Sequence, residues 1–428
     1  MFSVMSGFGD MYFSAYALFL KMTAAQIGFL SAIPALLGSS TQLLSAWIGQ
    51  RTGHRKRIVL TGITLQALMW LPIMVLPYLF PQDAGMVIVL CIVLYCGGNN
   101  LAAPLWGSLL GDLVPEDRRG RYFGRRSRIM NFANFIALIA AGTVLSYWRS
   151  KSLAGVGFLI IFSVAMVARL SSAYQVSRII EPAHKRGPQH KRSWVRMLRD
   201  LRKTQFARFS VFMALVNFSV SIAGPFFAIH MLRNLHFSYL EFMASTAVVV
   251  LMQFLCLSNW GRLADQYGNR RVLSVTAFLV PILPAMWLFT HSFTGIILIQ
   301  MLSGFAWSGF NLSASNYIYD AVTPDRRSTY VAVHNVLGSV ATFGGAALGA
   351  HLSTMDLAHL HFFGLYLSFR HTLPWLFLLS AIARLNTAIA LVPLLPELRS
   401  VERCSVPRLI WAATGCEGTC VLIGRALS

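Results

Sequence analysis

The chain has 428 residues, of which 56% are hydrophobic and only 12% charged, and its formal net charge at pH 7 is +21. So large an apolar share is more than a soluble core uses and is what bilayer hydrocarbon accepts, which excludes a soluble multidomain protein. The basic residues lie in short loops between apolar runs and in one longer central loop, without a separate basic domain that carries stacking aromatics. We therefore expect no binding of nucleic acid.

Apolar runs long enough for a transmembrane helix recur along the chain. The first set covers residues 1–20, 24–49, 57–80, 84–111, 123–148 and 154–176. The second set covers residues 207–232, 238–261, 271–292, 294–320, 329–351 and 372–396. The first run begins almost at residue 1 and has no signal-peptide pattern, which leaves open a true start further upstream.

These runs predict an all-α integral membrane protein with twelve transmembrane helices in two six-helix bundles. The bundles are expected at residues 1–176 and 207–396, joined by a basic linker at 177–206 and followed by a tail at 397–428.

A charged turn occurs twice, half a chain apart. Residues 111–124 read GDLVPEDRRGRYFG and residues 319–332 read YDAVTPDRRSTYVA. Each copy follows the fourth run of its half, so the two bundles are predicted to be duplicates. Duplicated bundles in a chain this apolar are typical of solute transporters.

The basic residues are unevenly divided between the two sides of the predicted membrane. Most of the 36 lie in loops after even-numbered runs and in the tail, whereas the loops after odd-numbered runs hold Lys21, Arg149, Lys151, Arg233 and Arg370. The positive-inside rule makes the even-side loops, the linker and the C-terminus cytoplasmic, in a multi-pass protein of the cytoplasmic (inner) membrane. The six cysteines then lie in apolar runs or in the reducing cytosol, so no disulfide framework is expected.

The central loop is amphipathic in its second part. Trp194, Met197, Leu198 and Leu201 share one helical face, with Arg and Lys on the other. This pattern suits a helix lying on anionic lipid. A solvated linker between the bundles explains the same residues equally well.

Residues 261–271 read GRLADQYGNRR, which resembles the loop signature G-x-L-A-D-x-x-G-x-R-R/K of the major facilitator superfamily. The equivalent residues 46–56, AWIGQRTGHRK, keep the turn glycine and the basic residues but have Ala46 and Gln50 in place of the first glycine and the Asp. The resemblance covers nearly the whole chain, to about residue 396. It implies two six-helix bundles related by a pseudo-two-fold axis along the membrane normal, with alternating access to a central site.

We interpret the repeated turns and the signature loops as cytoplasmic gate contacts. A carboxylate at a helix end can cap a neighbouring helix and pair with arginines, and such contacts can form and break as two bundles rock. The gate is the favoured interpretation for the aspartates, whereas the arginines are explained as well by anchoring of the topology. With Gln50 the first-half loop loses its acidic charge, so the two halves are not expected to close equally tightly. The candidate gate residues are Gly53, Arg55, Asp112, Arg118, Arg119, Gly261, Asp265, Gly268, Arg270, Arg271, Asp320, Arg326 and Arg327.

Asp10 is the one acidic residue well inside an apolar run. A charge at mid-bilayer costs roughly 2.5–3.5 kcal/mol, so Asp10 should face a cavity or a partner. It shares a helical face with Ser6 and Ser14, which suits a transport pathway with proton coupling or substrate contact. Two alternatives stay open: a structural pair with a basic residue such as Arg384, or a position near the end of a run that starts upstream.

Other polar residues fall in runs four, seven and ten, which in the family line the central cavity. A single Asn is more often a hydrogen-bonding contact between helices than a ligand contact. The candidate pathway residues there are Asn99, Asn100, Asn217, Trp307, Asn311 and Ser315.

The sequence carries no supported enzyme motif. The phosphate-binding pattern G-x4-G-K-S/T is missing, and His351, Asp356, His359 and His361 have no accompanying catalytic signature, so we expect no enzyme, metal or cofactor. We predict a secondary transporter that moves a small solute by alternating access, with proton-coupled export of an amphiphilic or neutral compound preferred. An uptake permease, a lipid facilitator and a non-transporting membrane sensor or scaffold are the alternatives. The expected partners are the small-molecule substrate, protons and membrane lipids, with the chain as a monomer.

Overall fold

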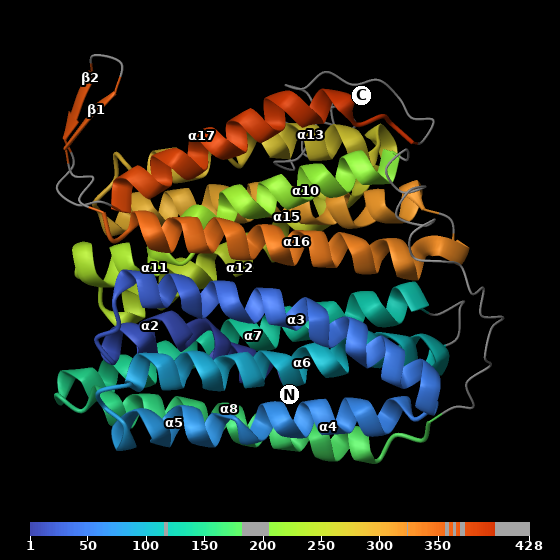
Figure 1. Cartoon of the computed structure of the whole chain (residues 1–428), viewed down its shortest axis with the longest axis horizontal. Helices are drawn as coiled ribbons and strands as arrows, with labels where there is room; N and C mark the ends of the chain where they lie inside the picture. Colours follow the sequence, from blue (N-terminus) through green and yellow to red (C-terminus); the bar gives the residue numbers. More distant parts are fainter. Residues whose placement is uncertain are drawn as a thin grey trace, which may run out of the picture. The chain divides into compact units, whose positions relative to one another are not determined.

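The computed structural model describes residues 1–114, 119–181, 205–322, 324–355, 359–362, 365–368 and 373–398 (Figure 1). Within this part the chain is helical apart from one short hairpin. The predicted amphipathic helix of the central loop and the predicted tail beyond residue 398 lie outside the described residues.

The helices of the first half follow the predicted runs. They are α1 (Phe2–Phe8), η1 (Asp10–Tyr12), α2 (Phe13–Phe19), α3 (Ala24–Thr52), α4 (Arg55–Leu68), α5 (Trp70–Leu79), α6 (Ala84–Leu113), α7 (Arg119–Ser150) and α8 (Ala154–Ser177).

The second half repeats this order and adds the hairpin. Its elements are α10 (Gln205–Ala223), α11 (Phe226–Ile229), the π-helix η3 (His230–Asn234), α12 (Tyr239–Tyr267), α13 (Asn269–Leu279), α14 (Ile282–Met286), α15 (Phe293–Ala321), α16 (Pro324–Leu352), β1 (His359–Phe362), β2 (Leu365–Ser368), α17 (Leu373–Leu391) and η4 (Val392–Leu394).

Nine helices in the described part of the chain are long and apolar enough to cross a membrane. Each coincides with one of the predicted runs. Of the other three predicted runs, 1–20 is interrupted at Gly9, 271–292 is divided between α13 and α14, and 329–351 falls in α16. The total of twelve spans therefore stays a prediction.

Proline explains why the third run of each half is divided. Pro72 lacks the N–H that the Leu68 carbonyl would accept in a continuous helix, and α4 gives way to α5 at this point. Pro281 has the same effect on the Ala277 carbonyl, and α13 gives way to α14 there. The two halves therefore share a helix break as well as a sequence repeat.

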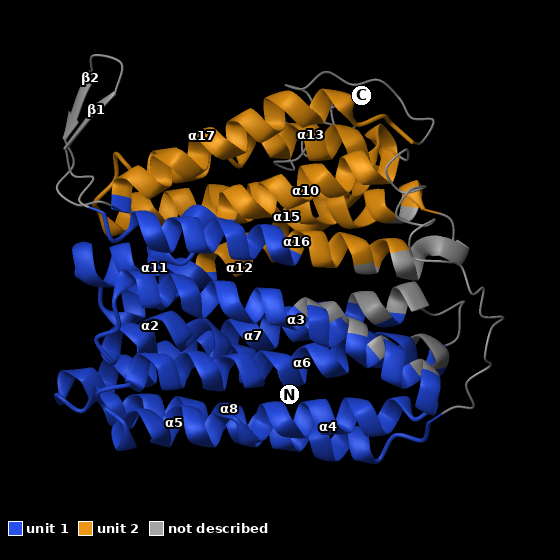
Figure 2. Cartoon of the chain, in the orientation of Figure 1, with its two compact units in different colours: residues 1–191, 221–247, 339–373 blue, residues 192–220, 248–338, 374–428 orange. Residues whose placement is uncertain are grey.

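The helices form two compact units, which Figure 2 shows in different colours. Unit 1 comprises residues 1–191, 221–247 and 339–373, and unit 2 comprises residues 192–220, 248–338 and 374–428. In unit 1, α6 packs against both α3 and α4, and α4 packs against α8. In unit 2, Phe209, Phe212, Phe310 and Tyr317 form a buried aromatic core, to which α13 and α15 contribute alongside α10. The predicted bundle limits follow the chain order and stay predictions.

The hairpin lies in the loop predicted between the last two runs. β1 and β2 are antiparallel, with His359 opposite Ser368 and Phe362 opposite Leu365. The all-α prediction did not include these strands.

Candidate functional site

The first helix is interrupted at Asp10. Gly9 ends α1 with its N–H donating to the Met5 carbonyl (2.9 Å), and the chain resumes as a single 3₁₀ turn that starts at Asp10. Gly9 is buried against the Trp70 indole, in space that a β-carbon would fill. The absence of a side chain at residue 9 therefore lets the Trp70 ring lie against the break. Interrupted helices are where transporters expose backbone and polar groups to a ligand.

Two side chains hydrogen-bond the Asp10 carboxylate. The Tyr95 hydroxyl donates from α6, and the Ser6 hydroxyl donates from one turn earlier in the same run. Arg169 on α8 lies within electrostatic reach of the carboxylate, and its guanidinium stacks 5.0 Å from the centre of the Phe2 ring. Arg169 is only 4% exposed, and its Nε has no hydrogen-bond partner among the described residues. Asp10 therefore has hydrogen-bond donors and a cation arranged around its carboxylate.

Aromatic rings enclose this centre. Phe13 stacks on Trp70 and meets the edge of Tyr95, with ring centroids 5.4 Å apart in both pairs. Trp70 is 5.0 Å from Tyr95 and 5.1 Å from Phe162. Asp10 itself is half-buried, so these rings cover only part of its surface. Tyr95 and Arg169 stabilise the ionised form of Asp10 on the covered side.

Arg384, the cation considered as a partner for Asp10, has another role. It lies on α17 in unit 2 and donates from Nη1 to the Val280 carbonyl (3.4 Å). That carbonyl has no helical donor, because residue 284 is a proline without an N–H. Arg384 therefore satisfies a backbone group that the break between α13 and α14 leaves free.

Among the other predicted pathway residues of unit 1, Asn100 joins two helices. Its amide oxygen accepts from Gln42 Nε2 on α3 (2.7 Å), and its amide nitrogen donates to the Cys96 carbonyl (2.9 Å). This is the interhelical hydrogen bonding that a lone Asn usually provides. Asn99 and Ser14 are half-buried.

The predicted pathway residues of unit 2 have local contacts. Asn217 lies beside Gly338, and the Trp307 ring meets the edge of Phe310 at 5.4 Å. The Asn311 carbonyl accepts from the Ser315 hydroxyl (2.8 Å). A cavity shared by these residues and Asp10 stays a prediction.

The turn glycines of the two signature loops both have positive φ. Gly53 has φ 69° and Gly268 has φ 90°, both in the region that residues with a side chain rarely adopt. Arg55, two residues after the first turn, is 2% exposed; it donates to the Ser108 hydroxyl (2.9 Å) and lies 3.7 Å from the Glu181 carboxylate. Arg55 therefore ties the start of α4 to α6 and to the end of α8.

The second signature loop forms a hydrogen-bonded chain with α15. Asn269 is fully buried, donates to the Asp320 carboxylate (2.7 Å) and accepts from the Asn316 amide (3.2 Å). Asp320 therefore binds the loop itself. Asp265 is exposed in the last turn of α12, and Arg270 and Arg271 are half-buried at the start of α13.

Several candidate gate residues cannot be placed. Arg118 lies outside the described residues, as do the side chains of Asp112, Arg119, Arg326 and Arg327. Gly261 lies within α12. The gate itself stays a prediction.

Within unit 1, segments from both halves of the chain pack at one end. The Arg149 guanidinium at the end of α7 lies 5.0 Å over the Tyr239 ring, and Arg233 Nη2 donates to the Met22 carbonyl (3.3 Å). Close packing at glycine supports these contacts, since Gly142 lies against Met243. The loops at this end are the ones that the basic-residue count assigns to the non-cytoplasmic side.

Comparison with known proteins decides the family. The family model of the major facilitator superfamily matches twice, over residues 1–221 and 209–408. The chain belongs to the major facilitator superfamily. Like other members of this family, it is a multi-pass membrane transporter for a small molecule and carries out no enzymatic reaction. Comparison with curated protein sequences finds no match.

Solved structures of other facilitators share the fold. A bacterial homologue of the iron transporter ferroportin, in an inward-facing state, matches with a TM-score of 0.70 and 15% identity over 91% of this chain and 95% of that one. The nucleoside transporter NupG matches with a TM-score of 0.67 and 15% identity, over 92% and 96%. A D-xylose–proton symporter matches with a TM-score of 0.67 and 12% identity, over 94% and 95%. Identities this low support the shared fold alone.

The sequence interpretation of this facilitator missed several partners. Tyr95 and Arg169 lie in apolar runs far along the chain from Asp10, and Asn269 occupies a variable position of the signature. Glu181 lies just beyond α8, outside any motif. The one available signal was the presence of an arginine within the sixth run, because a buried cation needs an anion or a ring nearby.

Proposed function

We propose that this facilitator is a secondary transporter that exchanges protons for a small amphiphilic or neutral solute by alternating access. The observation that carries the proposal is the position of Asp10 at a helix break, hydrogen-bonded by Tyr95 and near Arg169. A carboxylate held in this way can release its proton when its partners approach and take one up when they withdraw. Solute binding that displaces Tyr95 would therefore be linked to proton movement.

Alternating access is supported by the end of unit 1 at which segments from both halves of the chain pack, which we call the closed end. Arg149 and Tyr239 come from different halves of the chain, and so do Arg233 and Met22. We assign these contacts to the non-cytoplasmic gate, which must open when the solute leaves on that side. A D-xylose–proton symporter has the same fold, so the fold is compatible with proton coupling. The preference for export over uptake rests on the sequence interpretation.

The test is proton movement in vesicles. Purified protein would be reconstituted with a pH-sensitive dye inside, and D-xylose, a nucleoside and a neutral amphiphilic dye would be added in turn. For the transported solute we expect Asp10→Asn to abolish solute-linked proton flux while downhill solute flux continues. Asp83→Asn, which changes an exposed acid in the loop before α6, is the matched control and should behave as wild type. Proton flux of wild-type size in Asp10→Asn would refute the coupling role.

A further inference from the structure

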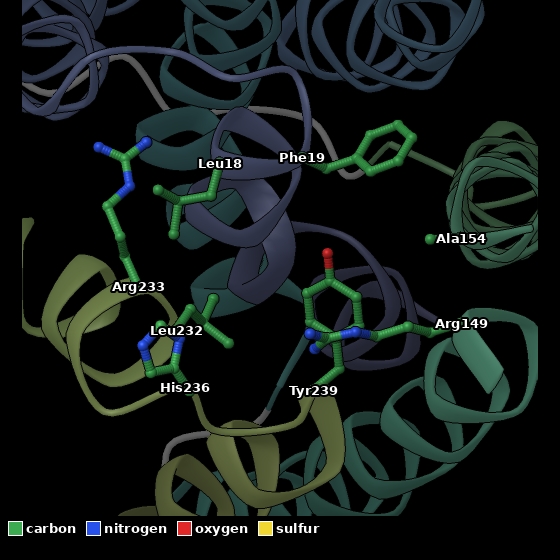
Figure 3. A pocket seen from close by; sticks show the side chains of 8 residues that line it. All are labelled: Leu18, Phe19, Arg149, Ala154, Leu232, Arg233, His236 and Tyr239. Carbon is green, nitrogen blue, oxygen red and sulfur yellow. The ribbon is translucent and has the colours of Figure 1, made fainter. Parts of the chain in front are cut away.

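A cavity of about 420 Å³ lies at the closed end of unit 1 (Figure 3). Its wall is basic and aromatic. Arg149 reaches in from the end of α7, Arg233 lies in η3, His236 lies in the segment between η3 and α12, and Phe19 and Tyr239 supply ring surface. None of the lining residues, all in the described part of the chain, is acidic.

The cations are unexpected on this side. Loops predicted to be non-cytoplasmic hold only a few basic residues, and two of them, Arg149 and Arg233, line this one cavity. The positive-inside rule disfavours basic residues here, so topology does not account for their presence. Both side chains are exposed; Arg149 contacts the Tyr239 ring and Arg233 the Met22 carbonyl.

Contacts of these residues leave much of their hydrogen-bonding capacity free for a ligand. The Arg149 guanidinium lies on a ring face, which engages its plane and leaves its N–H edge available. Arg233 uses Nη2 for the Met22 carbonyl. The neighbouring acid, Glu241, accepts from the Ser238 N–H and hydroxyl (2.8 Å each) at the start of α12, so its carboxylate serves that helix end.

We propose that this cavity binds an anionic amphiphile whose apolar body lies against Phe19 and Leu18. The guanidinium groups of Arg149 and Arg233 lie on different sides of the cavity (Figure 3), so one of them binds the carboxylate or phosphate group while the other cation and His236 add to the positive potential. Arginine suits such anions because its planar donors match two oxygens at once. A volume of about 420 Å³ is within the range of small-molecule sites. This inference concerns binding and stands whether or not Asp10 couples transport to protons.

The proposed anion site is tested by measuring ligand binding to the purified full-length protein in neutral detergent. Decyl phosphate is the probe, decyltrimethylammonium is the matched cation, and inorganic phosphate is the matched anion without an apolar body. We expect calorimetry to detect decyl phosphate binding that weakens at least about tenfold in Arg149→Gln/Arg233→Gln, the loss of roughly one charged hydrogen bond. Lys151→Gln removes a cation from the same end that lies instead on the Tyr147 ring, and should bind as wild type. Inorganic phosphate should bind at least about tenfold more weakly than decyl phosphate, for lack of apolar contact.

A second variant keeps the proposal testable if the protein with both arginine substitutions does not fold. Ala154→Glu adds a carboxylate to the cavity wall in the first turn of α8, where a helix tolerates an acidic residue. It should abolish decyl phosphate binding while the protein keeps its unfolding temperature. Wild-type affinity in both variants, or equal binding of decyltrimethylammonium, overturns the proposal.

The same titration in nanodiscs identifies the source of the anion. If phosphatidylglycerol discs lower the apparent affinity for decyl phosphate relative to discs of neutral lipid, a lipid headgroup occupies the cavity. Equal affinity in the two kinds of disc assigns the site to a soluble amphiphile.

Discussion

Arg169 and Arg384 lie on α8 and α17, the last long helices of the two halves, and both are buried, with 4% and 5% of their surface exposed. Their surroundings differ. Arg169 lies near the Asp10 carboxylate and over the Phe2 ring, whereas Arg384 donates to the Val280 carbonyl. Burial of a cation in an apolar run is therefore not enough to mark a transport pathway. The group that each arginine contacts makes the difference. Arg169 lies near a carboxylate that can bind a proton, whereas Arg384 donates to a backbone carbonyl at a helix break.

The signature loops differ between the halves in a similar way. The first uses the ion pair of Arg55 with Glu181, which belongs to no signature position. The second uses Asn269, which links Asp320 to Asn316. These contacts involve neither Gln50 nor Asp265, so the uneven closing expected from Gln50 stays a prediction. Both halves keep a glycine with positive φ at the turn, but ψ is 0° at Gly53 and 149° at Gly268, so the backbone of the two turns differs as well.

The largest difference in solute-linked proton flux is expected between the glutamine variants of the two buried arginines. Arg169→Gln removes the cation beside Asp10, and we expect solute-linked proton flux to fall by at least about tenfold, which is about 1.4 kcal/mol in the barrier. Arg384→Gln keeps an amide donor for the backbone and should change flux by less than about twofold. Vesicle flux with matched protein content measures both. Equal losses in the two variants would show that α17 carries a functional charge as well.

The turn glycines offer a comparison of stability. Gly53→Ala forces a residue with a side chain into a left-handed backbone, at a cost of about 1–2 kcal/mol. Gly268 has φ 90° and ψ 149°, a backbone close to the region restricted to glycine, and an added β-carbon also meets the Glu397 carboxylate, so for Gly268→Ala we expect about 3 kcal/mol. Chemical unfolding in detergent measures the difference. Glu397→Ala should recover part of the Gly268→Ala loss and none of the Gly53→Ala loss; recovery in both would remove the local explanation.

The sequence predicted the parts of this structure that depend on local pattern. Apolar runs located the helices, and the spacing of the signature placed Gly53 and Gly268 at turns, because hydrophobic length and positive φ act over a few residues. The break at Gly9 was missed because a single glycine is tolerated inside a helical pattern and does not by itself mark an interruption. Tyr95 and Asn269 were missed because their partners, Asp10 and Asp320, are distant in the chain, and no single sequence records which helices meet.

A smaller effect is expected where the second signature loop contacts α15. Asn269→Ala leaves the Asp320 carboxylate without this donor in a half-buried site, which should lower the free energy of unfolding by about 2 kcal/mol. Asn316→Ala removes only the weaker 3.2 Å contact and should cost about 1 kcal/mol. Thermal unfolding ranks the two variants. The reverse order would place the stabilising contact at Asn316 instead of Asp320.

The smallest effect separates a structural contact from a pathway contact in unit 1. Gln42→Met has a side chain of similar length and removes only the 2.7 Å hydrogen bond to Asn100. Hydrogen bonds between membrane helices average about 0.6 kcal/mol, so we expect a barely measurable loss of stability and unchanged solute flux. If solute flux falls severalfold while stability is preserved, the Asn100 amide acts on the solute. The polar pathway of the first half would then include Asn100 as well as Asp10. Unchanged flux leaves Asp10, Tyr95 and Arg169 as the polar centre of the first half, because Asn100 then only fastens α3 to α6.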